Sequence, residues 1–266
     1  METFSPQEIK MVLLPLIKKL RSKKQRPLII GLQGGQGTGK TTLGKFLKNH
    51  LTKQGFKVQQ FSIDDFYLSL KKRQSLQKKY PTNPFYQIRG MPGTHRLLYL
   101  QKTLQKLQKG KACYIPIFDK SLHAGQGDAE KRFFVKGRQD FIIFDGWCLG
   151  LLPVPLTEVL DTCKKYAVCP PVKPQDYQPV LDNIKPYQKI WQLVDYLVML
   201  KPDSSQSHQQ WRWQQEQELI KKTGSGKTQE QVISFVKFYL PLTYVCYDQL
   251  KPDYLIKIRE DHSLYI

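Results

Sequence analysis

Apolar runs and amphipathic stretches alternate along this chain, and their alternation predicts an α/β fold. Short apolar runs typical of buried strands occur at residues 27–32, 56–62, 141–146, 195–200 and 254–258. Apolar residues spaced three and four apart predict helices over residues 42–51, 94–110, 186–193 and 228–245. Strands and helices that alternate in this way predict a mostly parallel central sheet with helices on both faces.

The stretches between these elements differ in character. Residues 112–118 form either a further strand or an extended arm, because Pro116 interrupts the run. Residues 71–79 predict a basic helix, and residues 204–222 predict a polar, Gln-rich one. Residues 80–93 are rich in Pro, Gly and Asn, and a loop of that length inside a compact domain usually has a function. Residues 151–181 contain six prolines and predict mostly a connection.

Capping residues place several helix starts. Ser5 followed by Pro6 predicts the beginning of an N-terminal helix. Thr94 is expected to cap the helix that follows it, and Thr228 with Gln231 forms a capping box at the start of another.

The size and composition fit one domain. The chain has 266 residues, 40% of them apolar, and its 14 Tyr and 13 Phe argue against disorder. A chain of this length buries roughly three quarters of its unfolded surface, so it can form a large core. We expect a single domain over residues 1–266, with an N-terminal helix in 1–26 and the core in 27–258.

The charge and the cysteines narrow the class of protein. Lys and Arg number 42 against 22 Asp and Glu, and this net charge of +20 favours anionic ligands and raises nucleic acid as a partner. No reader motif such as zinc-finger spacing occurs, so we expect no specific nucleic-acid binding.

The five cysteines include no C-x-x-C, which disfavours a disulfide framework or a zinc site. No stretch is long enough to span a bilayer. We expect a soluble cytoplasmic protein without a membrane partner, and its oligomeric state stays open.

A glycine-rich segment carries the clearest chemistry. It reads Gly34-Gly35-Gln36-Gly37-Thr38-Gly39-Lys40-Thr41, which fits G-x-x-x-x-G-K-[ST] and lies between a predicted strand and a predicted helix. Glycines let backbone N–H groups approach phosphate oxygens, and the helix N-terminus adds unpaired donors. Lys40 would neutralise the β- and γ-phosphates, and the Thr41 hydroxyl would ligate Mg²⁺. The sequence therefore predicts ATP and Mg²⁺ as cofactors, with Thr42 completing the nucleotide site.

Carboxylates follow two other predicted strands. Asp64 and Asp65 come directly after the second strand, at the edge where open parallel sheets bind ligands. They form either a ligand site or the cap of a turn, and their spacing leaves both possible. Asp145 ends the apolar run 141–146, a Walker B pattern that places an acid near Mg²⁺. The metal candidates are therefore Thr41, Asp145 and Asp64. Lys40 with Asp64 suits phosphoryl transfer to a small hydroxyl, because that reaction needs a base that orients the acceptor.

Two further patterns limit the alternatives. The guanine-reading N-K-x-D is absent from the sequence, which disfavours a GTPase. The segment Gly224-Ser225-Gly226-Lys227-Thr228 imitates a second phosphate loop, but Lys221 stands where the motif needs Gly and no strand precedes it. We interpret it as the loop that starts the next helix.

Several motifs resemble one family of small-molecule kinases. Ser62-Ile63-Asp64-Asp65-Phe66-Tyr67 resembles the acceptor-side motif of the group that contains uridine kinase, pantothenate kinase and phosphoribulokinase. The closer resemblance, over about residues 27–258, is to the D-glycerate 3-kinases of plants, fungi and cyanobacteria. The segments that carry it are Arg89-Gly90-x-x-Gly93-Thr94-His95, Phe118-Asp119-Lys120-Ser121, Gly146-Trp147-x-Leu149-Gly150, Trp211-Arg212-x-Gln214-x-Glu216 and Phe235-Val236-x-x-Tyr239-Leu240-Pro241.

This resemblance implies a three-layer P-loop NTPase fold with a helical lid, and the reaction ATP + D-glycerate → ADP + 3-phosphoglycerate with Mg²⁺. By match to the motif, Asp64 would be the base. Arg212 would lie on the lid and stabilise the transferring group, with a solvated helix position as the alternative. The candidates for contacts with the hydroxy-acid substrate are Asp65, Tyr67, Arg89, His95, Asp119 and Lys120, since Arg in particular matches a carboxylate. For His95 the alternative is an ordinary polar residue at a helix start.

Three residues depart from the family pattern. Asp145 stands where relatives usually have Glu, Arg96 replaces the acid after His95, and Ala129 stands where relatives have Arg. The acceptor preference therefore stays open, with a uridine or pantothenate type of substrate as an alternative. An ATP-binding protein associated with nucleic acid, or a nucleotide-binding regulator without catalysis, would be a different class of function.

Overall fold

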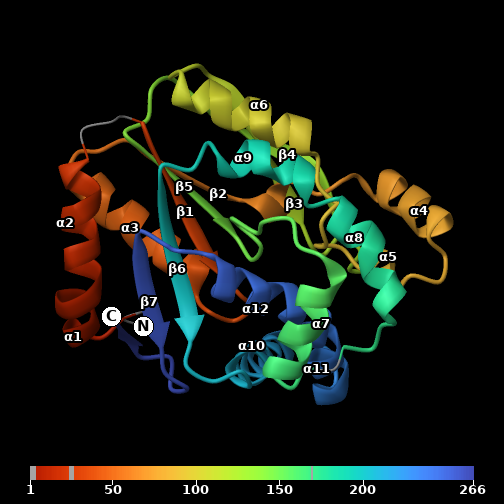
Figure 1. Cartoon of the computed structure of the whole chain (residues 1–266). Helices are drawn as coiled ribbons and strands as arrows, with labels where there is room; N and C mark the ends of the chain where they lie inside the picture. Colours follow the sequence, from red (N-terminus) through yellow and green to blue (C-terminus); the bar gives the residue numbers. More distant parts are fainter. Residues whose placement is uncertain (1–3, 24–26, 169) are drawn as a thin grey trace.

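A six-stranded sheet runs through the computed structural model, which describes residues 4–23, 27–168 and 170–266 (Figure 1). The strand order is β2-β5-β1-β6-β7-β8, in which β8 pairs antiparallel with β7 and the other pairs are parallel. The strands are β1 (Leu28–Gly34), β2 (Val58–Ser62), β5 (Phe141–Gly146), β6 (Tyr196–Pro202), β7 (Tyr254–Ile258) and β8 (Leu264–Tyr265). The expected mostly parallel α/β sheet is confirmed.

Helices cover both faces of this sheet and make the three layers. Leu28, Ile30 and Leu32 of β1 pack on one face with α2 (Leu14–Ser22) and α3 (Lys40–Lys53). Ile29 points to the opposite face, where it packs with α6 (Leu97–Gln108), and Figure 1 shows these helices on the two sides. Every residue of β1 and β5 is buried. Burial on both faces explains why these parallel strands are recognisable as continuous apolar runs.

The remaining helices surround the sheet and its carboxyl edge. Figure 1 shows α10 (Ser207–Thr223), α11 (Gln229–Lys237) and α12 (Leu240–Gln249) grouped beside the end of β6. Pro241 lies in the first turn of α12, where the missing N–H costs nothing, and the helix predicted over residues 228–245 is divided here into α11 and α12. The other helices and single turns are α4 (Leu70–Lys79), α5 (Pro84–Gln87), α7 (Leu156–Lys165), α8 (Gln178–Asp182), α9 (Gln188–Trp191), η2 (Ile63–Phe66), η3 (Pro174–Tyr177) and η4 (Lys185–Tyr187).

The N-terminal helices are tied to the strands at the far edge. Ser5 and Glu8 form the capping box of α1 (Pro6–Glu8), which confirms the predicted helix start. The chain continues through a π-helical segment, η1 (Ile9–Leu13), into α2. The Glu8 carboxylate accepts a hydrogen bond from the Leu264 amide at 2.7 Å, and the Val12 carbonyl accepts one from the Tyr254 hydroxyl at 2.8 Å. Residues 1–3 and 24–26 of the expected N-terminal segment lie outside the described residues.

Two of the longer elements were not expected from the sequence. The strand β4 (Asp128–Val135) pairs antiparallel with β3 (Cys113–Asp119) in a separate two-stranded sheet. Most of β4 is at least partly exposed, so it has no buried apolar run to reveal it. The helix α7, the turn η3 and most of α8 lie within residues 151–181, so the expectation that this stretch is mostly a connection is wrong. Pro155 takes the N-cap position of α7 and therefore precedes the helix without breaking it.

The predicted cap at Thr94 is also wrong. The Thr94 hydroxyl donates to the Met91 carbonyl at 2.7 Å and accepts from the Gly90 amide at 3.1 Å, which closes the preceding turn. The helix α6 begins at Leu97, and Arg96 before it makes no side-chain cap. The capping box predicted at the start of α11 is present.

Two expectations about the class of protein concern membranes and thiols. Across the ranges that the structure describes, no helix combines the length and apolar character needed to cross a membrane. Cys113, Cys148 and Cys246 are buried thiols that form no disulfide, and Cys169 lies outside the described residues.

We predict that the N-terminal helix is part of the cooperative core. The Leu16 side chain is 0% exposed and packs under the sheet, so Leu16→Ala should lower the free energy of unfolding by ~2–5 kcal/mol. Leu14, two residues earlier in α2, is 41% exposed, and Leu14→Ala is the matched control with an expected change below ~1 kcal/mol. Urea denaturation followed by circular dichroism measures both, and equal losses in the two variants would contradict the prediction.

Candidate active site

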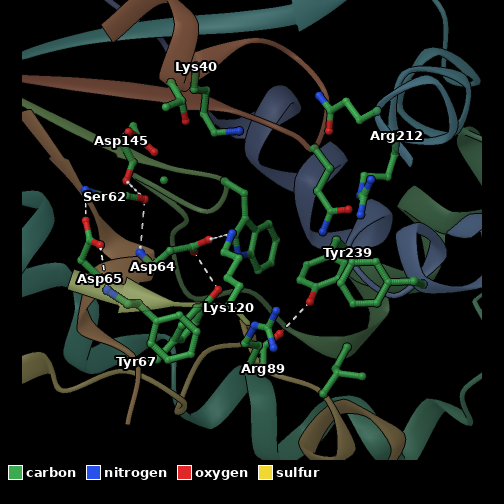
Figure 2. A pocket seen from close by; sticks show the side chains of 18 of the residues that line it. Lys40, Ser62, Asp64, Asp65, Tyr67, Arg89, Lys120, Asp145, Arg212 and Tyr239 are labelled. Atoms are coloured by element: carbon green, nitrogen blue, oxygen red, sulfur yellow. Dashed lines mark hydrogen bonds and ion pairs between the residues drawn. The ribbon is translucent and has the colours of Figure 1, made fainter. Parts of the chain in front are cut away.

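Three parallel strands bring residues that are distant in the sequence to one edge of the sheet. The strand β5 lies between β1 and β2, and its Asp145 is level with Leu32 on one side and with Ser62 on the other. The glycine-rich loop follows β1, and η2 with Asp64 follows β2. The three segments therefore meet at the carboxyl edge, where they line a cavity of about 1000 Å³ (Figure 2).

The glycine-rich loop curves around one end of this cavity. Gly37 and Gly39 have φ angles of +81° and +78°, in the region that side chains disfavour. A Cβ at Gly37 would also lie 2.8 Å from the Cβ of Trp211, so the loop fits here only with glycine. Six of the predicted nucleotide-binding residues line the cavity, namely Gln36, Gly37, Gly39, Lys40, Thr41 and Thr42.

The other predicted nucleotide-binding residues, Gly34, Gly35 and Thr38, do not line the cavity and stabilise the conformation of the loop. The Thr38 hydroxyl donates to the Gly35 carbonyl at 2.9 Å. The Gly35 amide donates to the hydroxyl oxygen of Tyr247 at 2.8 Å, so it is already engaged and is not offered to a phosphate. A Cβ at Gly34 would lie 2.7 Å from the Thr38 hydroxyl. These three residues therefore fix the loop's course, and we assign them no direct contact with the nucleotide.

Lys40 is the first residue of α3, and its ammonium reaches back over the loop. Its Nζ donates to the Gly35 carbonyl at 2.7 Å. Burial lowers the pKa of the Lys40 ammonium, and the negative charges of Asp145 and Asp64 oppose that change. The ammonium thus lies among carboxylates in a setting that favours a strong interaction with an incoming phosphate.

The two adjacent aspartates have different surroundings. The Asp64 carboxylate accepts hydrogen bonds from the Tyr67 hydroxyl at 2.7 Å and from Lys120 Nζ at 3.1 Å (Figure 2). Burial acts to raise the pKa of Asp64, but the Lys120 charge and the bond from Tyr67 outweigh it, and the net pKa is lowered. Asp64 is therefore an ionised carboxylate that lines the cavity.

The Asp65 carboxylate binds two backbone amides. Its carboxylate accepts hydrogen bonds from the Ser62 amide at 2.9 Å and from the Phe118 amide at 3.3 Å. With Ser62 it forms the capping box of η2, and it links that turn to β3. The turn-cap alternative is thus realised in Asp65, whereas Asp64 lines the cavity and stays the candidate ligand residue. Asp65 borders the cavity, but its oxygens serve the fold, so we do not retain it as a substrate ligand.

Oxygen ligands for a cation lie beside Lys40. Burial raises the pKa of the Asp145 carboxyl to about 6, and the Lys40 charge opposes that rise. Asp145 and Thr41 line the same cavity. One hydroxyl and one carboxylate, completed by water and phosphate oxygens, are the ligands that Mg²⁺ takes in nucleotide sites. Within the described residues no group of three or more His, Cys, Asp or Glu could hold a metal.

Two arginines converge at the other end of the cavity. Arg89 donates through Nη1 to the carbonyls of Gly125 and Gln126 at 2.7 and 3.0 Å. Arg73 of α4 donates to the same Gln126 carbonyl at 2.8 Å, and the two guanidinium groups lie 5.6 and 5.3 Å from the centre of the Phe118 ring. Arg73 is 5% exposed, and its Nη1 has no hydrogen-bond partner among the described residues. Burial lowers the pKa of Arg73, and the like charge of Arg89 lowers it further. The pair therefore concentrates positive charge at this end of the cavity, which favours an anionic ligand.

Two predicted substrate ligands do not face the cavity. His95 is buried behind Tyr67, with the two rings stacked 4.7 Å apart, and its Nδ1 is 2.7 Å from the Tyr187 hydroxyl. Burial lowers the pKa of His95 to about 4, so the ring is neutral. The Asp119 carboxylate accepts from the amide and hydroxyl of Ser121 and closes a turn. The structure therefore does not support either residue as a substrate ligand, whereas Tyr67, Arg89 and Lys120 line the cavity.

The helix α10 closes the cavity from the side of the glycine-rich loop. Arg212 lines the cavity and donates through Nη2 to Glu216 at 2.7 Å. The second oxygen of Glu216 accepts from the backbone amide of Lys227 at 2.9 Å, and Glu216 is 3% exposed. One buried carboxylate thus holds both Arg212 and the segment that imitates a phosphate loop. That segment precedes α11, as expected, but Lys227 also lines the cavity, which the sequence did not indicate.

The sequence analysis assigned no role to three other residues that line the cavity, Arg73, Trp147 and Tyr239. Trp147 and Tyr239 lie in motifs that resemble the kinase family but had no assigned role. The Tyr239 hydroxyl donates to the Arg89 carbonyl at 2.6 Å, and Tyr239 packs edge to face with Trp147 at 5.2 Å. Arg73 had no signal, because it is one of several cations in a basic helix.

Known proteins resemble this chain over most of its length. No family model matches it. A Schizosaccharomyces pombe protein named "Uncharacterized kinase mug58" is 34% identical over 245 residues, which are 88% of this chain and 86% of that protein. The Arabidopsis thaliana protein named "D-glycerate 3-kinase, chloroplastic" is 34% identical over 224 residues, which are 81% of this chain and 46% of the plant protein.

A solved structure agrees with these sequence relatives. The D-glycerate 3-kinase of Cryptococcus neoformans superposes with a TM-score of 0.80 at 28% identity, over 95% of this chain and 94% of that protein. The Schizosaccharomyces pombe protein is more than 30% identical to this chain, and the match covers most of its length. Several of the residues that line the cavity belong to the motifs that resemble the D-glycerate 3-kinases. On this evidence the chain is a phosphotransferase that belongs to the D-glycerate 3-kinase family of P-loop kinases.

Proposed function

We propose that the protein transfers the γ-phosphoryl group of ATP to the 3-hydroxyl of D-glycerate. The observation that carries the proposal is one cavity with two unlike ends. One end has the glycine-rich loop and Lys40, and the other has Arg73 and Arg89, with the carboxylate of Asp64 between them. A polyphosphate suits the first end, the carboxylate of a small hydroxy acid suits the second, and a base lies where the acceptor hydroxyl would be.

On the nucleotide side, the chain's own groups bind and orient the polyphosphate. The loop amides and the Lys40 ammonium would receive the β- and γ-phosphates. We assign Thr41 and Asp145 as the residues that would hold Mg²⁺, which would supply positive charge to offset that of the polyphosphate. Arg212 and Lys227 face the cavity from α10 and the loop after it, where they would offset charge on the transferring group.

On the acceptor side, Asp64 orients the hydroxyl and takes its proton. Its lowered pKa makes it a weak base, so an early proton abstraction is not its main contribution. Phosphoryl transfer passes through a loose transition state in most analyses, and there an oriented hydroxyl matters more than a strongly basic partner. Tyr67 and Lys120 hold the carboxylate in place for this role. With its oxygens so engaged, we assign Asp64 to the acceptor and not to the metal.

The direct test is an ATP-consumption assay with purified protein and Mg²⁺ over a panel of acceptors. The panel contains D-glycerate, L-glycerate, other small hydroxy acids, uridine and pantothenate. The proposal expects D-glycerate to give the highest kcat/KM and the product to be 3-phosphoglycerate. Turnover with uridine or pantothenate and none with glycerate would replace it by the related kinase activities.

Asp64→Asn should reduce kcat by at least ~100-fold, because the amide cannot accept the acceptor proton. The affinity for ATP should remain within about threefold, since Asp64 does not contact the loop. Asp65→Asn is the matched control, with a milder loss of kcat and a lower melting temperature, because its carboxylate serves backbone amides. Steady-state kinetics and thermal denaturation measure both variants. If Asp65→Asn were the inactive one, the two roles would have to be exchanged.

Replacing Arg73 or Arg89 should weaken the binding of D-glycerate and leave the binding of ATP unchanged. Arg73→Lys and Arg89→Lys each remove a planar donor pair, so the KM for D-glycerate should rise by about tenfold or more. The KM for ATP should change little. Arg132, which lies over Tyr114 on the β3–β4 hairpin, provides the control Arg132→Lys with no expected effect on either KM. A rise in the KM for ATP with an unchanged KM for glycerate would place the acceptor elsewhere.

A further inference from the structure

Two buried polar side chains that do not line the cavity contact the backbone of the glycine-rich loop. His208 of α10 has its Nδ1 2.7 Å from the carbonyl oxygen of Gln36. Tyr247 of α12 accepts the Gly35 amide at 2.8 Å. His208 is 0% exposed and Tyr247 is buried. The approach is close, because a Cβ at Gly35 would lie 2.3 Å from the His208 ring.

The donors and acceptors of this group can be assigned. A carbonyl oxygen only accepts, so the proton of His208 resides on Nδ1. Burial lowers the pKa of His208 to about 4, so the ring is neutral and its Nε2 is an acceptor, 3.4 Å from the Tyr247 hydroxyl. The Tyr247 hydroxyl lies 3.1 Å from the Leu200 carbonyl of β6, to which it donates. The loop is thereby joined to α10, α12 and the sheet.

The bond from His208 determines where the next amide points. In a trans peptide the C=O and the following N–H lie in one plane and point in opposite directions. The Gln36 carbonyl is held toward His208, so the N–H of Gly37 is directed the other way. Gln36 and Gly37 line the cavity and His208 does not, so the direction away from His208 is the direction of the cavity.

We propose that His208 and Tyr247 are positioning residues for nucleotide binding: His208 sets the Gly37 amide in the direction that a phosphate oxygen needs, and Tyr247 holds the Gly35 amide behind it. The inference rests on the proposed use of the loop for nucleotide phosphates. Neither side chain touches the nucleotide. Both act through the peptide groups of residues 35–37, and His208 lies one turn before Arg212 on the same helix.

The test uses three replacements of His208 and measures ADP binding to the full chain by calorimetry. The amide nitrogen of Asn can occupy the place of Nδ1, whereas that of Gln reaches toward the place of Nε2. His208→Asn should therefore keep the dissociation constant for ADP within about threefold of the unmodified protein. His208→Gln and His208→Phe should raise it by about tenfold or more, the effect of a lost hydrogen bond to a charged group.

Tyr247→Phe should also weaken ADP binding, because it leaves the Gly35 amide without its acceptor. Tyr244→Phe is the matched control, since its hydroxyl donates to Ser205 in the same region but does not contact the loop. The control should lose some melting temperature and no ADP affinity. Tyr247→Phe preserves the side-chain shape, so the proposal stays testable if a His208 variant fails to fold.

Two results would overturn the inference. One is equal weakening of ADP binding in the Asn, Gln and Phe variants, because a purely structural role does not distinguish the donor position. The other is an ADP affinity in His208→Gln and Tyr247→Phe that is unchanged from the unmodified protein. ADP binding does not depend on the acceptor, so failure of glycerate as a substrate would be recognised separately in the acceptor panel.

Discussion

The parallel register of β1, β5 and β2 is the constraint on which the site depends. Backbone hydrogen bonds put Asp145 level with Ser62 on one side and Leu32 on the other. From these levels, the next residues of each chain segment leave the sheet at the same edge. Lys40 and Asp64 are therefore brought to Asp145 by the ladder, before any side chain interacts. The side-chain contacts then refine the positions that the register of the strands determines.

The electrostatics of the cavity follow from this convergence. Burial disfavours the charged form of Lys40 and the charged form of Asp145. Because their charges are opposite, each residue stabilises the ionised form of the other. At the far end Arg73 and Arg89 repel one another, and the charge of Asp128 offsets only part of that repulsion at Arg73. An anion that enters there would be attracted by both guanidinium groups. The protein's excess of 20 positive charges adds a long-range attraction of the same sign, although it does not select the ligand.

The parts of this picture that depend on local sequence could be predicted, and those that depend on distant contacts could not. The glycine-rich loop, the buried strands and the capping box before α11 are encoded by neighbouring residues. The division of labour between Asp64 and Asp65 is not, because it depends on the Phe118 amide reaching Asp65 from β3. His95 was assigned to the substrate for its motif, yet Tyr67 lies between it and the cavity. Arg73 resembles every other cation of its helix until the fold buries it.

The helix α10 joins both halves of the nucleotide site, which limits how a lid could move. Its first turns lie behind the glycine-rich loop, where His208 contacts the Gln36 carbonyl and Trp211 donates to the Glu260 carbonyl at 3.0 Å. Arg212 follows Trp211 directly. A rigid swing that carried Arg212 far from the cavity would expose the buried Trp211 indole and break both bonds. The loop after α10 is anchored to the same helix, because Glu216 binds both Arg212 and the Lys227 amide, so Arg212 and Lys227 keep their places together.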